Sequence, residues 1–306
     1  MTTILLGPQR FTTTVTPALR SLDVDGPVAV INPGWEERES DDGELGALLD
    51  GRSRNLRLHE RLVAVLAEDE RFAAAALALR DRQDELRAFY GIRLRCAMDA
   101  VALVQHRSSL HGVRGAAVDA AIDAVRDVDS WYAAQLKELY RELESAAPAE
   151  ESESISRHRE QVADELRECS AVVLPGGHVG SLVRALRMFG VSVPAQLPVI
   201  AWSAGAMALT ERVVLFHDFA PHEASSPEVY DRGLGRLPGL AVFPHAKRRL
   251  RLDDAEAMQV LARRFPDLQL VLLDGGTFLR FEDEDGGLPE GTRVVTSEGR
   301  VAQVGS

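Results

Sequence analysis

Residues 198–209 read Pro-Val-Ile-Ala-Trp-Ser-Ala-Gly-Ala-Met-Ala-Leu, and this stretch decides the fold. An apolar strand that ends at Trp202 is followed by Ser203 and by small residues that open a helix. Such a sharp turn raises the serine hydroxyl above the edge of a sheet and places it near backbone N–H groups. The pattern predicts a nucleophile elbow, although Ala201 replaces the first glycine of the usual G-x-S-x-G. A serine that caps an alanine-rich helix is the plainer interpretation of the same residues.

Strands and helices alternate on both sides of this elbow. Helices are predicted at 13–22 and 182–189. The predicted strands are short and apolar, and polar and apolar residues do not alternate along them. They lie at 3–6, 27–32, 171–174, 198–202, 240–243, 268–273, 279–281 and 293–296. Strands of this kind indicate a sheet that is covered on both faces. We therefore expect an α/β fold with a doubly wound, mostly parallel sheet, built discontinuously from residues 1–55 and 169–306.

Residues 56–168 have a different character. The segment is rich in Ala, Leu, Glu and Arg, which are good helix formers, and it predicts an all-α insertion of four or five helices. We expect helix breaks near Gly91, at 111–115 and at 146–151.

Apolar residues between Val118 and Leu143 recur at steps of three, four and seven, on one helical stripe. Asp129 interrupts this stripe and is expected to be solvated or paired. The stripe predicts a helical layer over the sheet, and a partner or a second copy of the chain is the alternative occupant, which makes a homodimer an open prediction.

Composition excludes several classes of protein. The chain has 306 residues, of which 45% are apolar, and its 35 basic and 47 acidic residues give a formal charge of −12. An acidic surface disfavours non-specific binding of nucleic acid. The two cysteines, Cys96 and Cys169, lack the spacing of metal ligands and fit a reducing compartment. No apolar run is long enough to span a membrane and the N-terminus lacks a basic leader, so the sequence predicts a cytoplasmic protein that does not bind membranes.

A glycine pair follows the strand at 171–174, in the stretch Leu-Pro-Gly-Gly-His-Val-Gly that ends at Gly180. Glycines allow backbone N–H groups to approach a reacting carbonyl, as an oxyanion hole requires. A plain turn between a strand and a helix is the alternative. A phosphate-binding loop is a weaker one, since neither G-x-G-x-x-G nor the P-loop Lys-Ser/Thr is present.

A serine nucleophile needs a base, and His245 is placed to supply it. It follows the predicted strand 240–243, and the carboxyl ends of parallel strands lie at one edge of a sheet. The residues after it are basic, which is also typical of a solvated helix start. Residues 35–39, Trp-Glu-Glu-Arg-Glu, follow the second strand; an exposed acidic turn is the favoured interpretation, and the lining of the pocket is the other. A metal site from His217, Asp218, His222 and Glu223 is disfavoured, since their spacing matches no usual zinc pattern.

Several of these motifs together resemble a known family. Trp-Ser-Ala-Gly-Ala at 202–206, Leu-Pro-Gly-Gly at 174–177 and Pro-His at 244–245 are similar to motifs of the peptidase E and cyanophycinase group. These are serine peptidases on a class I glutamine-amidotransferase-like, or flavodoxin-like, fold. The resemblance covers roughly residues 170–282 and, more loosely, 1–33, but not the helical insertion.

The resemblance implies roles for individual residues. Ser203 matches the nucleophile, His245 the base, and Asp218 the aspartate that peptidase E carries fifteen positions after its serine. Asp274, in a degenerate copy of a cyanophycinase strand end, is the alternative partner of the histidine. Arg249 and Arg251 repeat the basic spacing that follows the cyanophycinase base, and guanidinium groups there are suited to bind a substrate carboxylate.

The mechanism implied is acyl transfer, with the backbone amides of Gly177 and Ala204 as the oxyanion hole. His178 stands where the family has asparagine, so it is a candidate substrate-binding residue whose role departs from the family's pattern. Gly275 replaces an acidic residue of cyanophycinase.

The sequence thus predicts a serine peptidase or amidase that acts on small peptides or amides, without metal or cofactor. A non-catalytic binding or scaffold protein on the same fold is the alternative.

Overall fold

The main sheet carries the strand that ends at Trp202, directly before Ser203. The computed structural model describes residues 1–109, 111–216, 226–282 and 287–305. The strand order is β10-β1-β5-β4-β2-β3, and all neighbours are parallel except β10 with β1. The strands are β1 (Thr3–Leu6), β2 (Val28–Val30), β3 (Ser53–Asn55), β4 (Ala171–Leu174), β5 (Val199–Trp202) and β10 (Phe278–Phe281). Every residue of β1, β2, β4 and β5 is buried, which explains their continuous apolar runs.

A second sheet carries the candidate base. Its order is β12-β11-β9-β8, with β8 parallel to β9, and a separate hairpin pairs β6 with β7. These strands are β6 (Arg212–Leu215), β7 (Glu228–Arg232), β8 (Leu240–Pro244), β9 (Gln269–Leu273), β11 (Arg293–Val295) and β12 (Val301–Gln303). The sequence analysis placed the strands that end at Trp202 and Pro244 in one sheet, whereas the structure places them in two.

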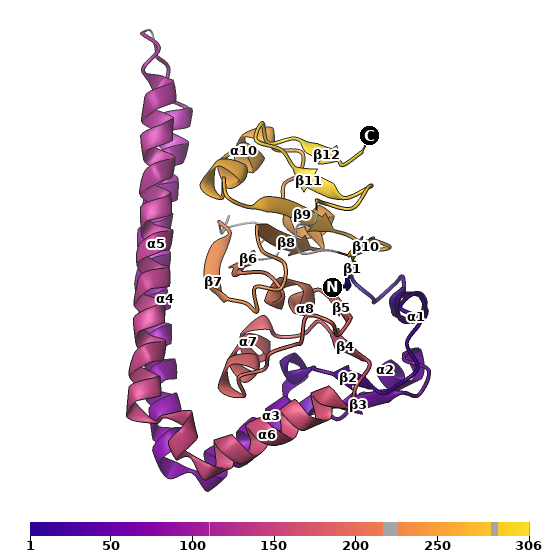
Figure 1. The fold of residues 1–306 in the computed structure, drawn as a ribbon. Helices are drawn as coiled ribbons and strands as arrows, with labels where there is room; N and C mark the ends of the chain where they lie inside the picture. The colour runs from indigo at the N-terminus through magenta and orange to yellow at the C-terminus, as the bar shows by residue number, and fades with distance from the viewer. Residues whose placement is uncertain (110, 217–225, 283–286, 306) are drawn as a thin grey trace.

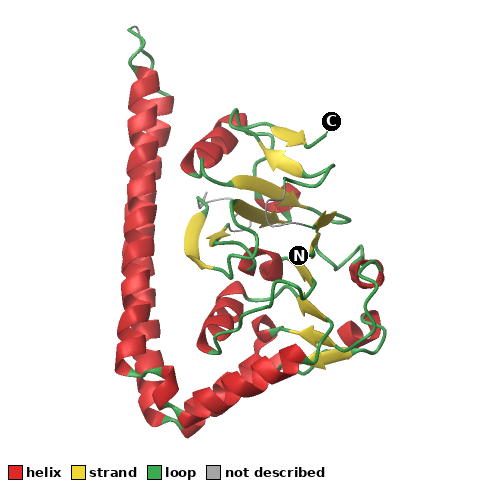
Figure 2. Ribbon diagram, in the orientation of Figure 1, coloured by secondary structure: helices red, strands yellow, loops and turns green. Residues whose placement is uncertain are grey.

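Helices lie on both faces of the main sheet, as expected for the doubly wound class (Figure 1, Figure 2). The helices of the α/β body are α1 (Val15–Arg20), α2 (Gly43–Leu48), α7 (Val179–Met188), α8 (Ala204–Ala208), α9 (Ala246–Arg249) and α10 (Ala255–Arg264), with the 3-10 segment η1 (Pro33–Arg38). Of these, α9 and α10 follow β8 and precede β9, so they connect strands of the second sheet. The predicted α/β class is therefore confirmed. Strands β3, β6, β7 and β12 were not predicted, because their residues are mostly polar or only half-buried.

The middle of the chain forms a long helical arm. Its elements are α3 (Leu58–Glu68), α4 (Glu70–Gln105), α5 (Arg114–Ala146), η2 (Ala149–Glu151) and α6 (Glu153–Arg167). Helices α4 and α5 pack along their length as an antiparallel hairpin beside the α/β body, and α3 and α6 run along its base (Figure 1). No described helix is long and apolar enough to cross a membrane.

The helix break predicted near Gly91 is wrong, because α4 continues through this residue. Tyr90 and Leu94, on either side of the glycine, are both buried in the core. A glycine inside a helix costs about 1 kcal/mol relative to alanine, and burial of these two large side chains outweighs it. Tertiary packing thus overrides a local propensity, as is common in long helices.

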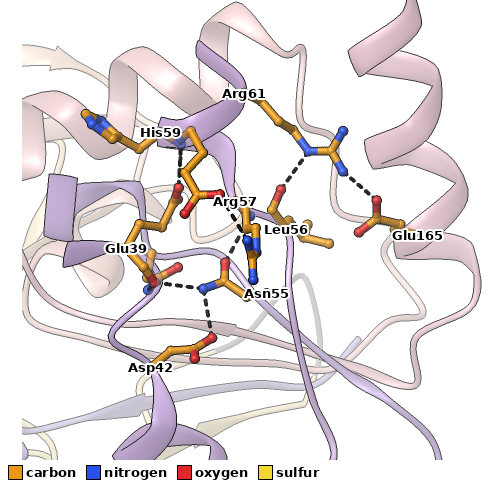
Figure 3. Close-up of polar contacts among 10 residues, drawn as sticks. Glu39, Asp42, Asn55, Leu56, Arg57, His59, Arg61 and Glu165 are labelled. Atoms are coloured by element: carbon orange, nitrogen blue, oxygen red, sulfur yellow. Dashed lines mark hydrogen bonds and ion pairs between the residues drawn. The ribbon is translucent and has the colours of Figure 1, made fainter. Parts of the chain in front are cut away.

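The base of the arm is tied to the loop that follows β2 (Figure 3). Glu39 is buried, and its carboxylate accepts hydrogen bonds from the backbone N–H groups of His59 and Glu60, each at 3.0 Å. Both N–H groups belong to the first turn of α3, where backbone N–H groups have no acceptor within the helix. Burial raises the pKa of Glu39, and the two backbone donors oppose that rise. The segment 35–39 is therefore not simply an exposed acidic turn, because its last residue is a buried anchor.

Candidate functional site

Ser203 has a strained backbone at the turn where the sequence predicts a nucleophile elbow. It follows β5 and precedes α8, with φ 51° and ψ −123°, a region that non-glycine residues rarely occupy. Its side chain is half-buried. The neighbouring chain is very close, since a Cβ added at Gly205 would overlap the carbonyl oxygen of Leu174. The residues after the serine must therefore be small, because the end of β4, which precedes the glycine loop, leaves no space for larger ones.

The glycine loop after β4 lies directly against Ser203. A Cβ built on Gly176 would be 2.9 Å from the Ser203 Cβ and 3.4 Å from its Oγ. Gly177 has φ 137°, and a Cβ there would lie 2.5 Å from the carbonyl oxygen of Gly34. Among the described residues, the backbone N–H groups of Gly177 and Ala204 donate to no acceptor. The glycine loop and the first turn of α8, both next to Ser203, therefore each contain a backbone N–H that has no acceptor among the described residues.

The turn after β2 braces this loop. The indole Nε1–H of Trp35 donates to the carbonyl oxygen of Gly176 at 2.9 Å, and His178 N–H donates to the carbonyl oxygen of Gly34 at 2.7 Å. Glu36, in the same turn, has φ 57° and ψ −126°, which is almost the conformation of Ser203. Trp35 is half-buried. The alternative interpretation of this segment, as part of the pocket wall, stays a prediction. The bond of Trp35 to a residue 141 positions away could not be inferred from sequence.

His178 caps α7. Its Nδ1 accepts from the Ser181 N–H at 3.2 Å and lies 2.9 Å from the Ser181 Oγ, which itself donates to the Glu36 carboxylate at 2.6 Å. The cap requires an unprotonated Nδ1, so the proton of a neutral ring lies on Nε2. The side chain is 64% exposed. The histidine thus fixes the start of α7 and keeps one edge of its ring accessible.

His245 lies at the carboxyl end of β8 with a left-handed backbone, φ 59° and ψ 34°. Its N–H donates to the carbonyl oxygen of Leu273 at 2.8 Å. Helix α8, which begins after Ser203, packs against β8. The serine and the histidine therefore stand at the carboxyl ends of strands from two sheets that α8 connects, and their direct contact stays a prediction.

Asp274, the alternative partner of the histidine, holds the turn that follows His245. Its Oδ1 accepts from the backbone N–H of Lys247 at 2.9 Å, and its Oδ2 pairs with Arg293 at 2.5 Å. A Cβ on Gly7, at the end of β1, would overlap the backbone oxygen of Asp274, so this turn also adjoins the main sheet. Both carboxylate oxygens thus have structural partners. Asp218, the first choice, lies outside the described residues.

Arg249 and Arg251 line a cavity of about 370 Å³ between α4 and α10. The guanidinium carbon of Arg249 lies 5.8 Å from the centre of the Phe216 ring. Ser203, Gly177 and His245 are not among the residues that line this cavity. A contact between these arginines and a substrate at Ser203 therefore stays a prediction.

The metal interpretation has no support in the described part of the chain. No group of three or more His, Cys, Asp or Glu side chains is arranged there to hold an ion. The four residues that the sequence analysis considered, His217, Asp218, His222 and Glu223, lie outside the described residues.

Comparison with known proteins identifies the family of this chain. No curated protein matches the chain. The crystal structure of a peptidase from an acI-B1 Actinobacterium aligns with a TM-score of 0.44 and 13% identity, over 99% of this chain and 93% of that one. The family model for peptidase family S51 matches residues 122–288, more than half of the chain, and this span holds the elbow, the glycine loop and His245. The chain therefore belongs to peptidase family S51, the peptidase E and cyanophycinase family of serine peptidases.

Proposed function

We propose that this peptidase hydrolyses peptide or amide bonds through an acyl-enzyme formed on Ser203, with His245 as base and Asp218 as the residue that orients it. The observation that carries the proposal is the strained Ser203, against which Gly176 packs closely. The Gly177 and Ala204 N–H groups, in the loop and the helix next to it, have no acceptors among the described residues. A non-glycine residue held at positive φ costs of order 1–3 kcal/mol, and such strain is concentrated at functional sites.

The reaction proceeds in two balanced steps. His245 takes the Ser203 proton as Oγ attacks the scissile carbonyl, and the N–H groups of Gly177 and Ala204 bind the oxyanion. His245 then returns the proton to the leaving amine, and the acyl-enzyme forms. Water attacks the ester with His245 again as base, which releases the acid and restores the hydroxyl. Asp218 holds the imidazole in the required tautomer and stabilises its protonated form.

Covalent labelling tests the nucleophile directly. A fluorophosphonate bonds to an activated serine oxygen and loses fluoride, and we expect a single adduct on the peptide that contains Ser203. The same reagent should leave the Ser203→Ala variant unlabelled. Ser181 is the internal control, because it lies beside His178 but donates its hydroxyl proton to Glu36. Labelling at Ser181 instead would assign the nucleophile to that residue, and no labelling of the wild type would favour a non-catalytic binding protein. Either result would contradict the proposal.

Trp35 gives a second prediction, because it holds the peptide group that contains the Gly177 amide. The Gly176 carbonyl and the Gly177 N–H belong to one planar unit, so the indole bond to the oxygen sets the direction of the N–H. Loss of one oxyanion donor typically lowers kcat by about 10²–10³-fold, and we expect Trp35→Phe to lower it by roughly tenfold with little change in KM. Steady-state kinetics on a cleaved peptide measures both.

The control for Trp35→Phe is Trp131→Phe on α5, where the Arg93 guanidinium carbon lies 4.2 Å from the centre of the ring and no hydrogen bond joins the indole to the glycine loop within the described ranges. Inhibition by a peptide aldehyde, which mimics the tetrahedral intermediate, should weaken in Trp35→Phe by the same factor as kcat. Unchanged kcat and unchanged aldehyde affinity would show that the indole does not orient the amide.

A further inference from the structure

A pocket of about 170 Å³ lies where the helical arm faces α7 and β7. Its wall includes Arg80 and Arg87 of α4, Arg184 of α7, Tyr230 of β7, and His178 and Gly180 at the start of α7. The family model begins at residue 122, so α4 belongs to the part of the arm that this match leaves out. The arm thus supplies a wall to a pocket whose other wall is part of the peptidase body.

This pocket adjoins the glycine loop beside Ser203, because His178 and Gly180, which follow the loop in the chain, line it. A Cβ on Gly180 would collide with the Tyr230 hydroxyl and would lie 3.0 Å from Cε1 of His178, so the phenol and the imidazole are near neighbours. The guanidinium carbon of Arg87 lies 4.7 Å from the centre of the Tyr230 ring. His178 directly follows Gly177, the proposed oxyanion donor. The contacts therefore lead from Gly177 through His178 and Tyr230 to Arg87.

The pocket wall carries an excess of positive charge. Arg80, Arg87 and Arg184 have no carboxylate within ion-pair distance anywhere in the described ranges. Asp231 also lines the pocket, but its carboxylate is already bound by Arg187 at 2.8 Å and by the Tyr140 hydroxyl at 2.5 Å. Of the described residues that line the pocket, Asp84 is the one remaining carboxylate that offsets the three guanidinium groups.

This excess is notable in a chain with a formal charge of −12. Guanidinium groups bind carboxylates in a bidentate geometry, and cations gathered in a partly enclosed site attract anions from solution.

We propose that the helical arm completes an anion subsite of the peptidase, in which Arg80, Arg87 and Arg184 bind a substrate carboxylate remote from the scissile bond. The role of this subsite rests on the proposed function, because it extends the binding surface of Ser203. It is separate from the cavity lined by Arg249 and Arg251 between α4 and α10. The arm is then part of the substrate-binding surface, and specificity depends on its position against α7.

Matched peptides test the subsite during turnover. For each peptide that the wild type cleaves, versions with Glu and with Gln at each position would be compared. We expect one position where Glu raises kcat/KM about tenfold relative to Gln, chiefly because it lowers KM. The Arg80→Gln/Arg184→Gln double variant should lose this preference and retain cleavage of the Gln peptides. Arg95→Gln is the matched control, because this exposed residue lies on the same helix and outside the pocket. An unchanged preference in the double variant would overturn the proposal.

Charge reversal separates recognition from a structural role. Arg184→Glu should invert the preference at that position, so that a Lys peptide is cleaved faster than the Glu peptide. Loss of activity on all peptides without inversion would assign Arg184 a structural role and contradict the subsite.

Binding of glutarate tests the same groups without catalysis. This dicarboxylate has no scissile bond, and calorimetry should show saturable binding to wild type and to Ser203→Ala, weakened at least about tenfold in the double variant. The two proposals then fail separately. Absence of Ser203-dependent cleavage with intact glutarate binding would refute the acyl-enzyme, whereas Ser203-dependent cleavage with equal glutarate affinity in wild type and double variant would refute the subsite.

Discussion

Replacing Ser203 by alanine is expected to lower kcat on any cleaved peptide by roughly 10⁴–10⁶-fold, because removal of the nucleophile leaves only the oxyanion hole and substrate binding. Substrate affinity should change little, since the hydroxyl is not needed to bind the peptide. The measurement is single-turnover cleavage at saturating enzyme, with the peptide's dissociation constant determined in parallel. Activity within tenfold of wild type would exclude an acyl-enzyme on this residue.

A second variant at the same position separates chemistry from strain. Ser203→Gly also removes the hydroxyl, but glycine adopts φ 51° without the clash that a Cβ causes. We expect the free energy of unfolding of Ser203→Gly to be about 1 kcal/mol higher than that of Ser203→Ala. This difference is what remains of the relieved backbone strain once the greater conformational freedom of glycine in the unfolded chain is subtracted. Denaturant unfolding of the two inactive variants measures the difference. Equal stability would mean that the surrounding chain does not strain this residue.

The elbow was predictable because its signals are local. A buried apolar strand, a serine and three small residues are contiguous between Pro198 and Ala206, and the steric reason for each is visible in the sequence. The structure shows the same steric constraint. Ser203 has a positive φ, and any Cβ at Gly205 would overlap the neighbouring backbone. The parallel strands were predictable for a similar reason, since burial on both faces produces unbroken apolar runs.

Features that depend on distant partners could not be predicted. Trp35 meets Gly176 only because β2 pairs with β4, and nothing in residues 35–39 indicates this register. Strand β7 buries Val229 and a polar residue, Asp231, and α5, which is distant in the sequence, packs against it. The continuation of α4 through Gly91 likewise depends on burial of its neighbours rather than on helix propensity.

Asp129 illustrates the same limit and has the largest expected effect on stability. The sequence marked it as an interruption of an apolar stripe, to be solvated or paired. In the structure its carboxylate receives two hydrogen bonds of 2.6 Å from Arg264 of α10, and one of 2.7 Å from the Tyr90 hydroxyl. All three side chains are buried, and the Tyr90 oxygen also accepts the Val229 N–H of β7 at 3.0 Å. Burial raises the pKa of Tyr90, so the phenol remains a donor.

We expect Asp129→Ala to lower the free energy of unfolding by about 3–5 kcal/mol, because it leaves the Arg264 guanidinium buried without its counter-charge. Glu142→Ala is the surface control; its partner Arg82 is half-exposed, and removal of such a pair costs about 1 kcal/mol or less. Denaturant unfolding at neutral pH measures both variants.

Replacement of both partners, in Asp129→Leu/Arg264→Met, should recover much of the loss, since an apolar pair of similar volume leaves no uncompensated charge.

The same variants connect stability with specificity. The Asp129 cluster fixes α4 and α5 against α10 and β7, and the three arginines that line the pocket beside His178 stand on α4 and α7. An arm loosened by Asp129→Ala should therefore lose the preference for a carboxylate peptide before it loses cleavage of neutral ones. Retention of that preference in a variant destabilised by several kcal/mol would show that the pocket is held by other contacts, such as the Tyr140–Asp231–Arg187 cluster.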